Sequence, residues 1–370
     1  MKKKKVGIIT FHNEQNYGAV LQAYALQETI KKLGCESYII NYIEPIEKYW
    51  KSIFTEKQKI ANIKIWLKIM ITNIVYFKKN RKRKKNFYKF INKNIKLYGK
   101  YKNERQLKDN APEFDVYITG SDQVWNTKIT KGLKDAYTLN FGTSNITRAS
   151  YAASLGNDKI DESEIAEYRE KLKILNKISV REDTGKEILE KILHRNIELV
   201  LDPTLLLDRK DWNNVKSDSK DEKKKYILIY DLEKNNIVYE VANEIKEKLK
   251  IPIVNFRRKR QKKIIGKYES GPEEFLNLIN NAEIVVTNSF HGAVFSIIFH
   301  KKFYVIPHTT TFSRTKNLLR ILNLEKQIIG DKKQIKDILS EEEINYELVE
   351  EKLKIERQKS IKYIEKVLNY

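Results

Sequence analysis

Short apolar runs alternate with stretches of helical periodicity along most of this chain. The first unit contains an apolar strand over 6–11, a polar loop, a helix from Gly18 to Gly34 and a second strand over 37–41. Strand, helix and strand joined by short connections predict a βαβ unit. Such a unit implies a parallel sheet whose ligands bind at the carboxyl ends of its strands.

The alternation continues through two successive sets of elements, and 370 residues exceed the size at which one core usually stops growing. The first set has expected strands over 114–119, 148–153 and 177–181 and a helix over 163–175; the second has strands over 198–201, 226–230, 252–256, 283–287 and 303–306 and helices over 238–249 and 292–299. We predict an N-terminal α/β lobe over 1–195, a C-terminal α/β lobe over 196–345 and a charged helix over 346–370 that packs back on the first lobe.

The segment from Ile60 to Phe77 has its apolar residues at helical spacing, and a block from Lys78 to Lys85 follows it in which seven of eight residues are basic. Lys64 and Lys68 interrupt the apolar run, which excludes a transmembrane helix. Two interpretations stay open for this insertion near 55–90: an amphipathic helix on an anionic membrane surface, or an ordinary helix followed by a solvated basic stretch.

The formal charge of +23 raises the question of nucleic acid. Lysine is spread along the whole chain, however, and no zinc-finger, RNA-recognition or helix-turn-helix pattern accompanies it, which makes a nucleic-acid partner unexpected. The single cysteine, Cys35, excludes an intramolecular disulfide and fits a reducing compartment. The basic start leads into a short first strand, not a signal peptide, so a cytoplasmic location is expected.

The loop from Thr287 to Gly292 is the most informative local feature, because it places Asn288, Ser289 and His291 between a strand and a helix. Free amides at a helix start bind phosphate or carboxylate. Ser289 alone could instead cap the helix. His291 is a candidate for acid/base chemistry, with a neutral packing histidine as the alternative.

Two arginines follow strands at the same predicted edge. Arg181 closes the strand over 177–181, and Arg314 lies in the loop after the final strand. Either can hold a carboxylate or phosphate with two hydrogen bonds, and either can instead form a salt bridge with a nearby acid such as Glu182 or Asp183.

Polar residues of the first lobe complete the candidate site. Candidates for binding a polar acceptor are Asn13, Asn16, Tyr17 and Gly18 in the first loop and Ser121 and Asp122 after the strand over 114–119. Gly-Ser-Asp is also good turn chemistry, which is the alternative for Ser121 and Asp122. We find no Walker loop, no GxGxxG after the first strand, no nucleophile elbow and no histidine pair with metal spacing.

Four segments together resemble the polysaccharide pyruvyl transferase family: Asn16–Tyr24, Gly120–Asn126, Ser179–Glu182 and Asn288–Gly292. They occur in family order, and the resemblance extends from the first strand to about Arg314. It implies two Rossmann-like lobes of the glycosyltransferase-B type, phosphoenolpyruvate as co-substrate without a nucleotide cofactor, and a saccharide acceptor that is often lipid-linked. The product would carry pyruvate as a cyclic ketal on two hydroxyls.

The resemblance also implies roles for individual residues. His291 would protonate the methylene carbon of the donor or deprotonate the attacking hydroxyl. Arg181, the helix start at Asn288, Ser289 and Gly292, and Arg314 would hold the donor, while the loops around Asn16 and Ser121 would present the sugar diol. The alternative function is a nucleotide-sugar glycosyltransferase of the same architecture, and a third is a noncatalytic polymer-binding protein, because fold alone does not decide the donor.

Overall fold

The computed structural model describes residues 3–43, 63–157, 159–217, 225–257, 264–309, 312–330 and 343–370, with side chains of the helix that starts at Ile63 described from Tyr76 onward. Its described part contains two five-stranded parallel sheets, ordered β3-β2-β1-β4-β5 and β10-β9-β8-β11-β12. The first sheet consists of β1 (Lys5–Ile9), β2 (Glu36–Tyr42), β3 (Leu97–Tyr101), β4 (Val116–Thr119) and β5 (Thr147–Ser150). The second consists of β8 (Ile227–Tyr230), β9 (Ile253–Asn255), β10 (Ile264–Gly266), β11 (Ile284–Thr287) and β12 (Lys302–Val305). The predicted α/β class with two parallel sheets is confirmed.

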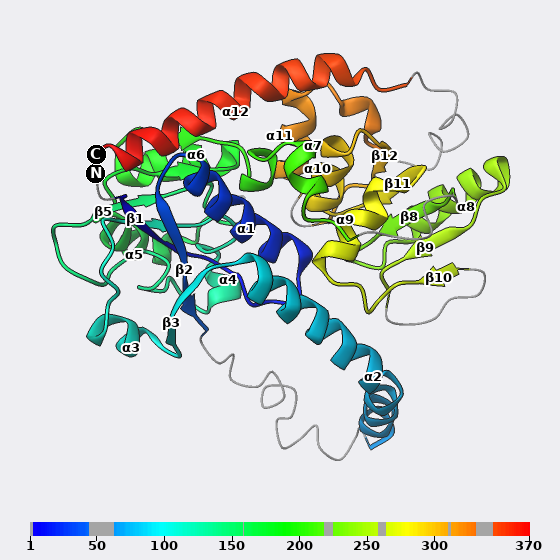
Figure 1. The fold of residues 1–370 in the computed structure, drawn as a ribbon, viewed down its shortest axis with the longest axis horizontal. Coiled ribbons are helices and arrows are strands. Elements are labelled where there is room, and N and C mark those ends of the chain that lie inside the picture. Colours follow the sequence, from blue (N-terminus) through cyan, green and yellow to red (C-terminus); the bar gives the residue numbers. More distant parts are fainter. Residues whose placement is uncertain are drawn as a thin grey trace.

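Helices surround the two sheets, as Figure 1 shows. Those of the first half are α1 (Tyr17–Lys32), α2 (Ile63–Asn94), α3 (Glu104–Asp109), α4 (Thr127–Thr130), α5 (Glu162–Leu172) and α6 (Asp183–Leu193). Those of the second half are α7 (Arg209–Asn213), α8 (Asn236–Leu249), α9 (Pro272–Asn280), α10 (Phe290–Ile298), α11 (Ser313–Ile321) and α12 (Tyr346–Leu368). Short 3₁₀ turns occur at Pro203–Leu205 and Glu325–Gln327.

The first βαβ unit forms for local reasons. Asn16 caps α1 by accepting from the amide of Ala19, and the helix ends before Gly34, whose φ of 87° suits glycine. β1 lies between β2 and β4, with Gly7 opposite Tyr38 on one side and Tyr117 on the other. The carboxyl ends of β1 and β4 therefore deliver their loops to the same edge of the sheet.

One strand lies on a different lobe from the one we expected. The segment over 198–201 was assigned to the second set, but β7 (Glu198–Leu199) pairs in parallel with β6 (Ser179–Val180). Isolated bridges from Ala149 to Lys177 and from Ala153 to Val180 join β6 to the β5 edge of the first sheet. The residues that follow β7 are therefore brought to the first lobe.

We expected the basic block Lys78–Lys85 to follow the end of a helix. It lies instead inside the single helix α2. Its inward positions, among them Arg83, Phe87 and Phe90, are buried or half-buried against the body, and this packing extends the helix through the charged run. Residues 55–62, with which the predicted insertion begins, lie outside the described residues. Across the described part of the chain, no helix is both long and apolar enough to span a membrane.

An aromatic cluster joins the two lobes. The ring of Tyr17 stacks on Phe275 with centroids 4.3 Å apart and also contacts Phe87, Tyr230 and Phe256. Its hydroxyl donates to the carbonyl of Ser270 at 2.8 Å and accepts from Arg83 at 2.6 Å. Side chains of both lobes thus share one continuous core at the junction.

The C-terminal helix α12 crosses from the second lobe to the first, ending beside the N-terminus (Figure 1). At its start, Glu350 pairs with His300 at 3.0 Å. Near its end, Tyr363 donates to the carbonyl of Ser150 at 2.8 Å, and Ser360 accepts from the amide of Leu201 at 2.9 Å. The helix therefore contacts both lobes along its length.

Candidate active site

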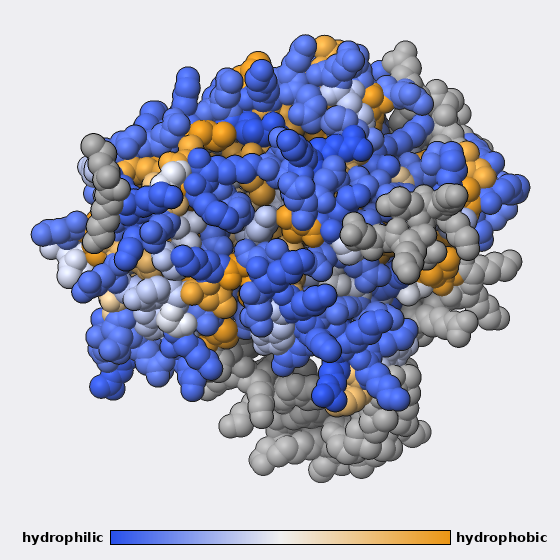
Figure 2. Space-filling view, viewed as in Figure 1, coloured by the Kyte–Doolittle hydropathy of each residue, from blue (hydrophilic) through white to orange (hydrophobic). Residues whose placement is uncertain are grey.

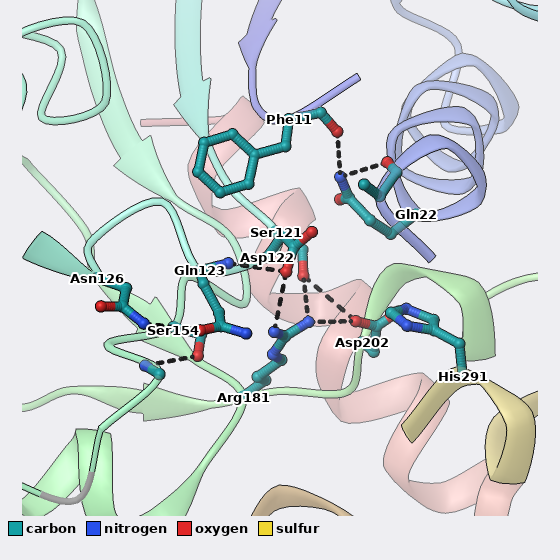
Figure 3. A network of polar contacts seen from close by, with 12 residues as sticks. Phe11, Gln22, Ser121, Asp122, Gln123, Asn126, Ser154, Arg181, Asp202 and His291 are labelled. Atoms are coloured by element: carbon teal, nitrogen blue, oxygen red, sulfur yellow. Dashed lines mark hydrogen bonds and ion pairs between the residues drawn. The ribbon is translucent and has the colours of Figure 1, made fainter. Parts of the chain in front are cut away.

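Four segments meet where the first sheet faces the start of α10. They are the turn after β4 with Ser121 and Asp122, Arg181 after β6, Asp202 after β7, and His291 in the first turn of α10. Because parallel strands present their carboxyl ends at one edge, residues distant in sequence converge here. Figure 3 shows Arg181 at the centre, with Asp202 between it and His291.

Arg181 is buried and surrounded by three carboxylates. Its Nη1 lies 2.9 Å from Oδ2 of Asp202, its Nη2 3.3 Å from Oδ1 of Asp122, and its Nε 3.6 Å from Oε2 of Glu182. Burial by itself would lower the pKa of Arg181, but the three carboxylates together raise it. The salt-bridge alternative is thus present, and the charge of Arg181 is already compensated within the protein.

Asp202 links the arginine to the histidine. Its Oδ2 accepts from Arg181 and from the hydroxyl of Ser121 at 3.3 Å, while its Oδ1 accepts from the amide and hydroxyl of Thr204 at 3.0 and 2.6 Å. Burial favours the neutral carboxyl, but His291, Arg181 and Thr204 outweigh it and hold the pKa of Asp202 below its ordinary value. Asp202 is therefore a carboxylate over the whole physiological range.

His291 is buried beside this carboxylate. Its Nε2 lies 3.8 Å from Oδ1 of Asp202, which is ion-pair range but too long for a hydrogen bond, and Nε2 has no other partner among the described residues. The opposite side of the ring lies against Gly18 of α1, where a Cβ would come 2.1 Å from Nδ1. Gly18 thus lets the imidazole of the second lobe approach the backbone of the first.

A second guanidinium, that of Arg314, also lies against the ring of Phe290. The centres of the Arg181 and Arg314 guanidinium groups lie 5.6 and 5.2 Å from the centroid of the Phe290 ring. Nε of Arg314 is buried without a hydrogen bond, and burial together with the charge of Arg181 lowers the pKa of Arg314 to about 10. The charges of Asp122, Glu182 and Asp202 partly offset this lowering of the pKa of Arg314. Within the described ranges Arg314 nevertheless has no carboxylate at ion-pair distance, so its guanidinium has charge available for a ligand.

Two small cavities of about 10 and 30 Å³ adjoin Arg314, and a larger pocket of about 170 Å³ lies between the lobes. Asn16 and Tyr17 line the larger pocket from the first lobe, Arg83 from α2, and Asp231 and Arg257 from the second lobe. Arg257 pairs with Asp231 at 2.6 Å. The pocket therefore offers aromatic surface, amide groups and guanidinium groups side by side.

The remaining predicted site residues lie apart from the Arg181 cluster. Asn288 donates to Asp231 at 2.8 Å and accepts from the amide of Leu232 at 2.8 Å, which ties the loops after β11 and β8 together. The helix begins at Phe290, earlier than the predicted 292, and the side chain of Ser289 makes no capping hydrogen bond. Gly292 lies against Thr287, and Asn13 is half-buried in the first loop.

Sequence reasoning did not select Asp202, Glu182, Phe290 or Arg83 as site residues. Asp202 had a usable signal, since Asp202-Pro203 directly follows an apolar run of the kind that ends at a sheet edge. Glu182 and Phe290 lie within two of the four segments that carry the resemblance. Within the described parts of the chain, no group of three or more His, Cys, Asp and Glu side chains is arranged to hold a metal ion.

Several solved structures share the fold. The UDP-GlcNAc 2-epimerase of Methanocaldococcus jannaschii aligns over 92% of this chain and 93% of its own, with a TM-score of 0.50 and 16% identity. The glycosyltransferase SnogD of Streptomyces nogalater aligns over 99% of this chain and 100% of its own, with a TM-score of 0.50 and 9% identity. At these identities the similarity concerns the fold alone, and it confirms the predicted glycosyltransferase-B architecture of two Rossmann-like lobes.

A search of curated proteins found no matching relative. The family model for polysaccharide pyruvyl transferases, by contrast, matches residues 16–310. This range contains the four segments that carry the resemblance, as well as Asp202 and all of the residues lining the interlobe pocket except Gln15. The chain belongs to the polysaccharide pyruvyl transferase family.

Proposed function

We propose that this protein transfers a pyruvyl group from phosphoenolpyruvate to two hydroxyls of a saccharide. Both hydroxyl oxygens bond to the central carbon of the donor, and the bond from that carbon to the phosphate oxygen breaks. One hydroxyl proton goes to the methylene carbon, which becomes a methyl group, and the other goes to the released phosphate. The products are a cyclic ketal and inorganic phosphate, and no oxidant or reductant is needed.

The observation that carries the proposal is the half-buried guanidinium of Arg314, whose Nε is buried without a hydrogen bond and which has no ion-pair partner among the described residues. Phosphoenolpyruvate bears a phosphate and a carboxylate, and an arginine without a carboxylate in ion-pair range is suited to such a ligand. Arg181 has three carboxylates around it, so we assign it mainly to holding Asp122 and Asp202 in place. The cavities beside Arg314, of about 10 and 30 Å³, have room for only about one water molecule each, so donor binding requires the surrounding side chains to move.

His291 is the group in this site suited to moving protons near neutral pH. Its Nε2 lacks a hydrogen bond, and the nearby Asp202 stabilises the imidazolium that forms when the ring accepts a proton from a hydroxyl. The same ring can then deliver that proton to the methylene carbon of the donor. In this scheme Asp202 positions and stabilises His291 without exchanging protons itself.

We place the acceptor in the interlobe pocket. Tyr17 and Phe256 line this pocket with the edges of aromatic rings, and the exposed side chain of Asn16 carries an amide for hydroxyls, a combination suited to a saccharide. This pocket adjoins the Arg181 cluster through the consecutive residues Asn16, Tyr17 and Gly18. Ser121 is fully buried and holds Asp202, so its proposed contact with the diol requires the lobes to open.

The test is calorimetric binding of phosphoenolpyruvate and of nucleotide sugars to the wild type and to Arg314→Gln. The matched control is Arg320→Gln, which removes the same charge from an exposed position of the same helix α11. We expect Arg314→Gln to weaken phosphoenolpyruvate binding by at least about tenfold, the worth of one lost charged hydrogen bond, and Arg320→Gln to leave it unchanged. Tight nucleotide-sugar binding without phosphoenolpyruvate binding would instead assign the protein as a nucleotide-sugar glycosyltransferase.

A further inference from the structure

Helix α2 concentrates positive charge to an unusual degree. Its 32 residues include eleven lysines and arginines and no acidic residue, although the whole chain has 49 acidic residues. A helix in which basic residues are not interspersed with acids gains no support from pairs along its own surface and repels itself. The charge therefore needs an explanation outside the helix.

The inward side of α2 is fixed to both lobes by its contacts. Arg83 donates to the carbonyl of Gln15 in the first lobe at 3.0 Å and to that of Tyr268 in the second at 2.8 Å. Asn86 donates to the carbonyl of Glu269 at 2.9 Å, and Lys93 pairs with Glu273 at 2.9 Å. These contacts fix the orientation of the helix about its own axis, so its outward side has a defined direction.

The outward side is a continuous cationic surface. At about 100° per residue, the exposed side chains of Lys78, Arg81, Lys82, Lys84, Lys85 and Lys89 fall within the half of the helix opposite Arg83. None of the six has an ion-pair partner among the described residues. Figure 1 shows the N-terminal end of α2 pointing away from the two sheets, and the six side chains that follow this end are exposed.

Two exposed aromatic rings lie at one edge of this cationic surface. Phe77 is 62% exposed and Tyr88 40% exposed, while most of the molecular face in Figure 2 is hydrophilic. Lys84 lies 5.6 Å from the ring centroid of Tyr88. Unpaired cations beside exposed aromatic rings on a helix match an anionic lipid surface, where the cations attract headgroups and the rings enter the interface.

We propose that the outward side of α2 docks the protein on an anionic membrane. Duplex nucleic acid would also attract the cations, but its bases are stacked inside and it presents phosphates outward, so it offers Phe77 less apolar surface than a bilayer does, which favours the bilayer. Docking itself does not depend on the proposed chemistry. The benefit of docking for catalysis, however, rests on the proposed function. Arg83 lines the interlobe pocket on the opposite side of the same helix, so a lipid-linked saccharide would reach the pocket from the docked surface.

The experiment is cosedimentation of the full chain with vesicles of phosphatidylcholine, with and without phosphatidylserine. The variant Lys82→Gln/Lys85→Gln removes two outward cations of α2, and Lys354→Gln/Lys362→Gln removes two exposed cations of α12 as the matched control. Each cation near an anionic surface contributes about a fivefold change in affinity, so we expect the α2 pair to lower binding about 25-fold and the α12 pair to leave it unchanged.

A third variant separates lipid from nucleic acid. Phe77→Ser should weaken vesicle binding at high salt, where the electrostatic part is screened, and should leave any binding to duplex DNA unchanged. All five positions are exposed, so matching thermal unfolding curves will show that the variants are folded. Equal losses for the α2 and α12 pairs, or tighter binding to duplex DNA than to anionic vesicles, would overturn the proposal. Phosphoenolpyruvate binding in the same variants should be unaffected, which keeps a failure of docking distinct from a failure of the proposed function.

Discussion

Replacing Gly18 by alanine is the most direct probe of the contact between the lobes at His291. A Cβ at this position would come 2.1 Å from Nδ1, 2.4 Å from Cε1 and 2.7 Å from Cγ of the imidazole. Non-bonded atoms of this kind are comfortable at about 3.5 Å, so the overlap exceeds about 1 Å. The methyl group is fixed to the backbone of α1, and the buried ring has to move.

Two opposing effects set the magnitude. Alanine is better than glycine inside a helix by about 1 kcal/mol, whereas overpacking a buried contact costs about 1–3 kcal/mol. We therefore expect a net destabilisation of about 0–2 kcal/mol, which is small enough to leave the protein folded. The effect on turnover should be larger, because displacing a reacting group by about 1 Å lowers the rate about a hundredfold.

The assay combines urea unfolding with phosphate release from phosphoenolpyruvate in the presence of a panel of cell-surface saccharides. A double-mutant cycle with His291→Ala isolates the contact, because the smaller side chain removes the overlap. In the His291→Ala background, Gly18→Ala should be neutral or stabilising. An equal loss of stability in both backgrounds, or full turnover in Gly18→Ala, would refute the assigned role of this contact.

Three further predictions concern stability. Asp202→Asn should destabilise by about 1–3 kcal/mol, because Arg181 keeps Asp122 and Glu182. Since the pKa of Asp202 is lowered in the folded state, the difference in free energy of unfolding between wild type and variant should persist from neutral pH to about pH 4 and shrink below it. Urea titrations at acid pH that show a constant difference would contradict this. Burial lowers the pKa of His12, so the unfolded chain binds more protons below about pH 6.5 and stability should fall as the pH decreases through that value. His12→Gln should reduce this slope in unfolding curves and leave the part due to His308, whose pKa burial also lowers. Tyr363→Phe should lower the free energy of unfolding by about 1 kcal/mol, near the lower end for a buried hydroxyl, because Ser179 also donates to the carbonyl of Ser150. Tyr370→Phe at the exposed chain end serves as control. An equal effect of both variants on the unfolding midpoint would disprove the docking contact of α12.

The elements predicted well are those whose limits are set within their own segment. The helix from Gly18 to Gly34 differs from α1 by a residue or two at each end, since Asn16 caps its start and Gly34 supplies the positive φ beyond its end. The strand over 283–287 likewise corresponds to β11. In both cases periodicity, cap and glycine all act within a few residues of the boundary.

The elements predicted wrongly depend on distant partners. The residues over 198–201 look like a strand, but only the pairing with Ser179–Val180 decides that β7 belongs beside β6. The basic run of α2 looks like a solvated stretch, but burial of Phe87 and Phe90 against the lobes keeps it helical. In both cases the residues that decide the structure are distant in sequence from the segment itself.

The candidate site divides in the same way. The sequence by itself determined the family, the two-lobed parallel architecture and the placement of Ser121, Arg181 and His291 after strands, because alternation, turn residues and strand ends are properties of local order. Only the tertiary structure decided that Asp202 lies between Arg181 and His291 and that Gly18 faces the imidazole. It also decided that Arg181 forms ion pairs with three carboxylates, while Arg314 forms none with the described residues. Those relations depend on which side chains share a buried volume, and burial is what sets the strength of each charge and the distance of each contact.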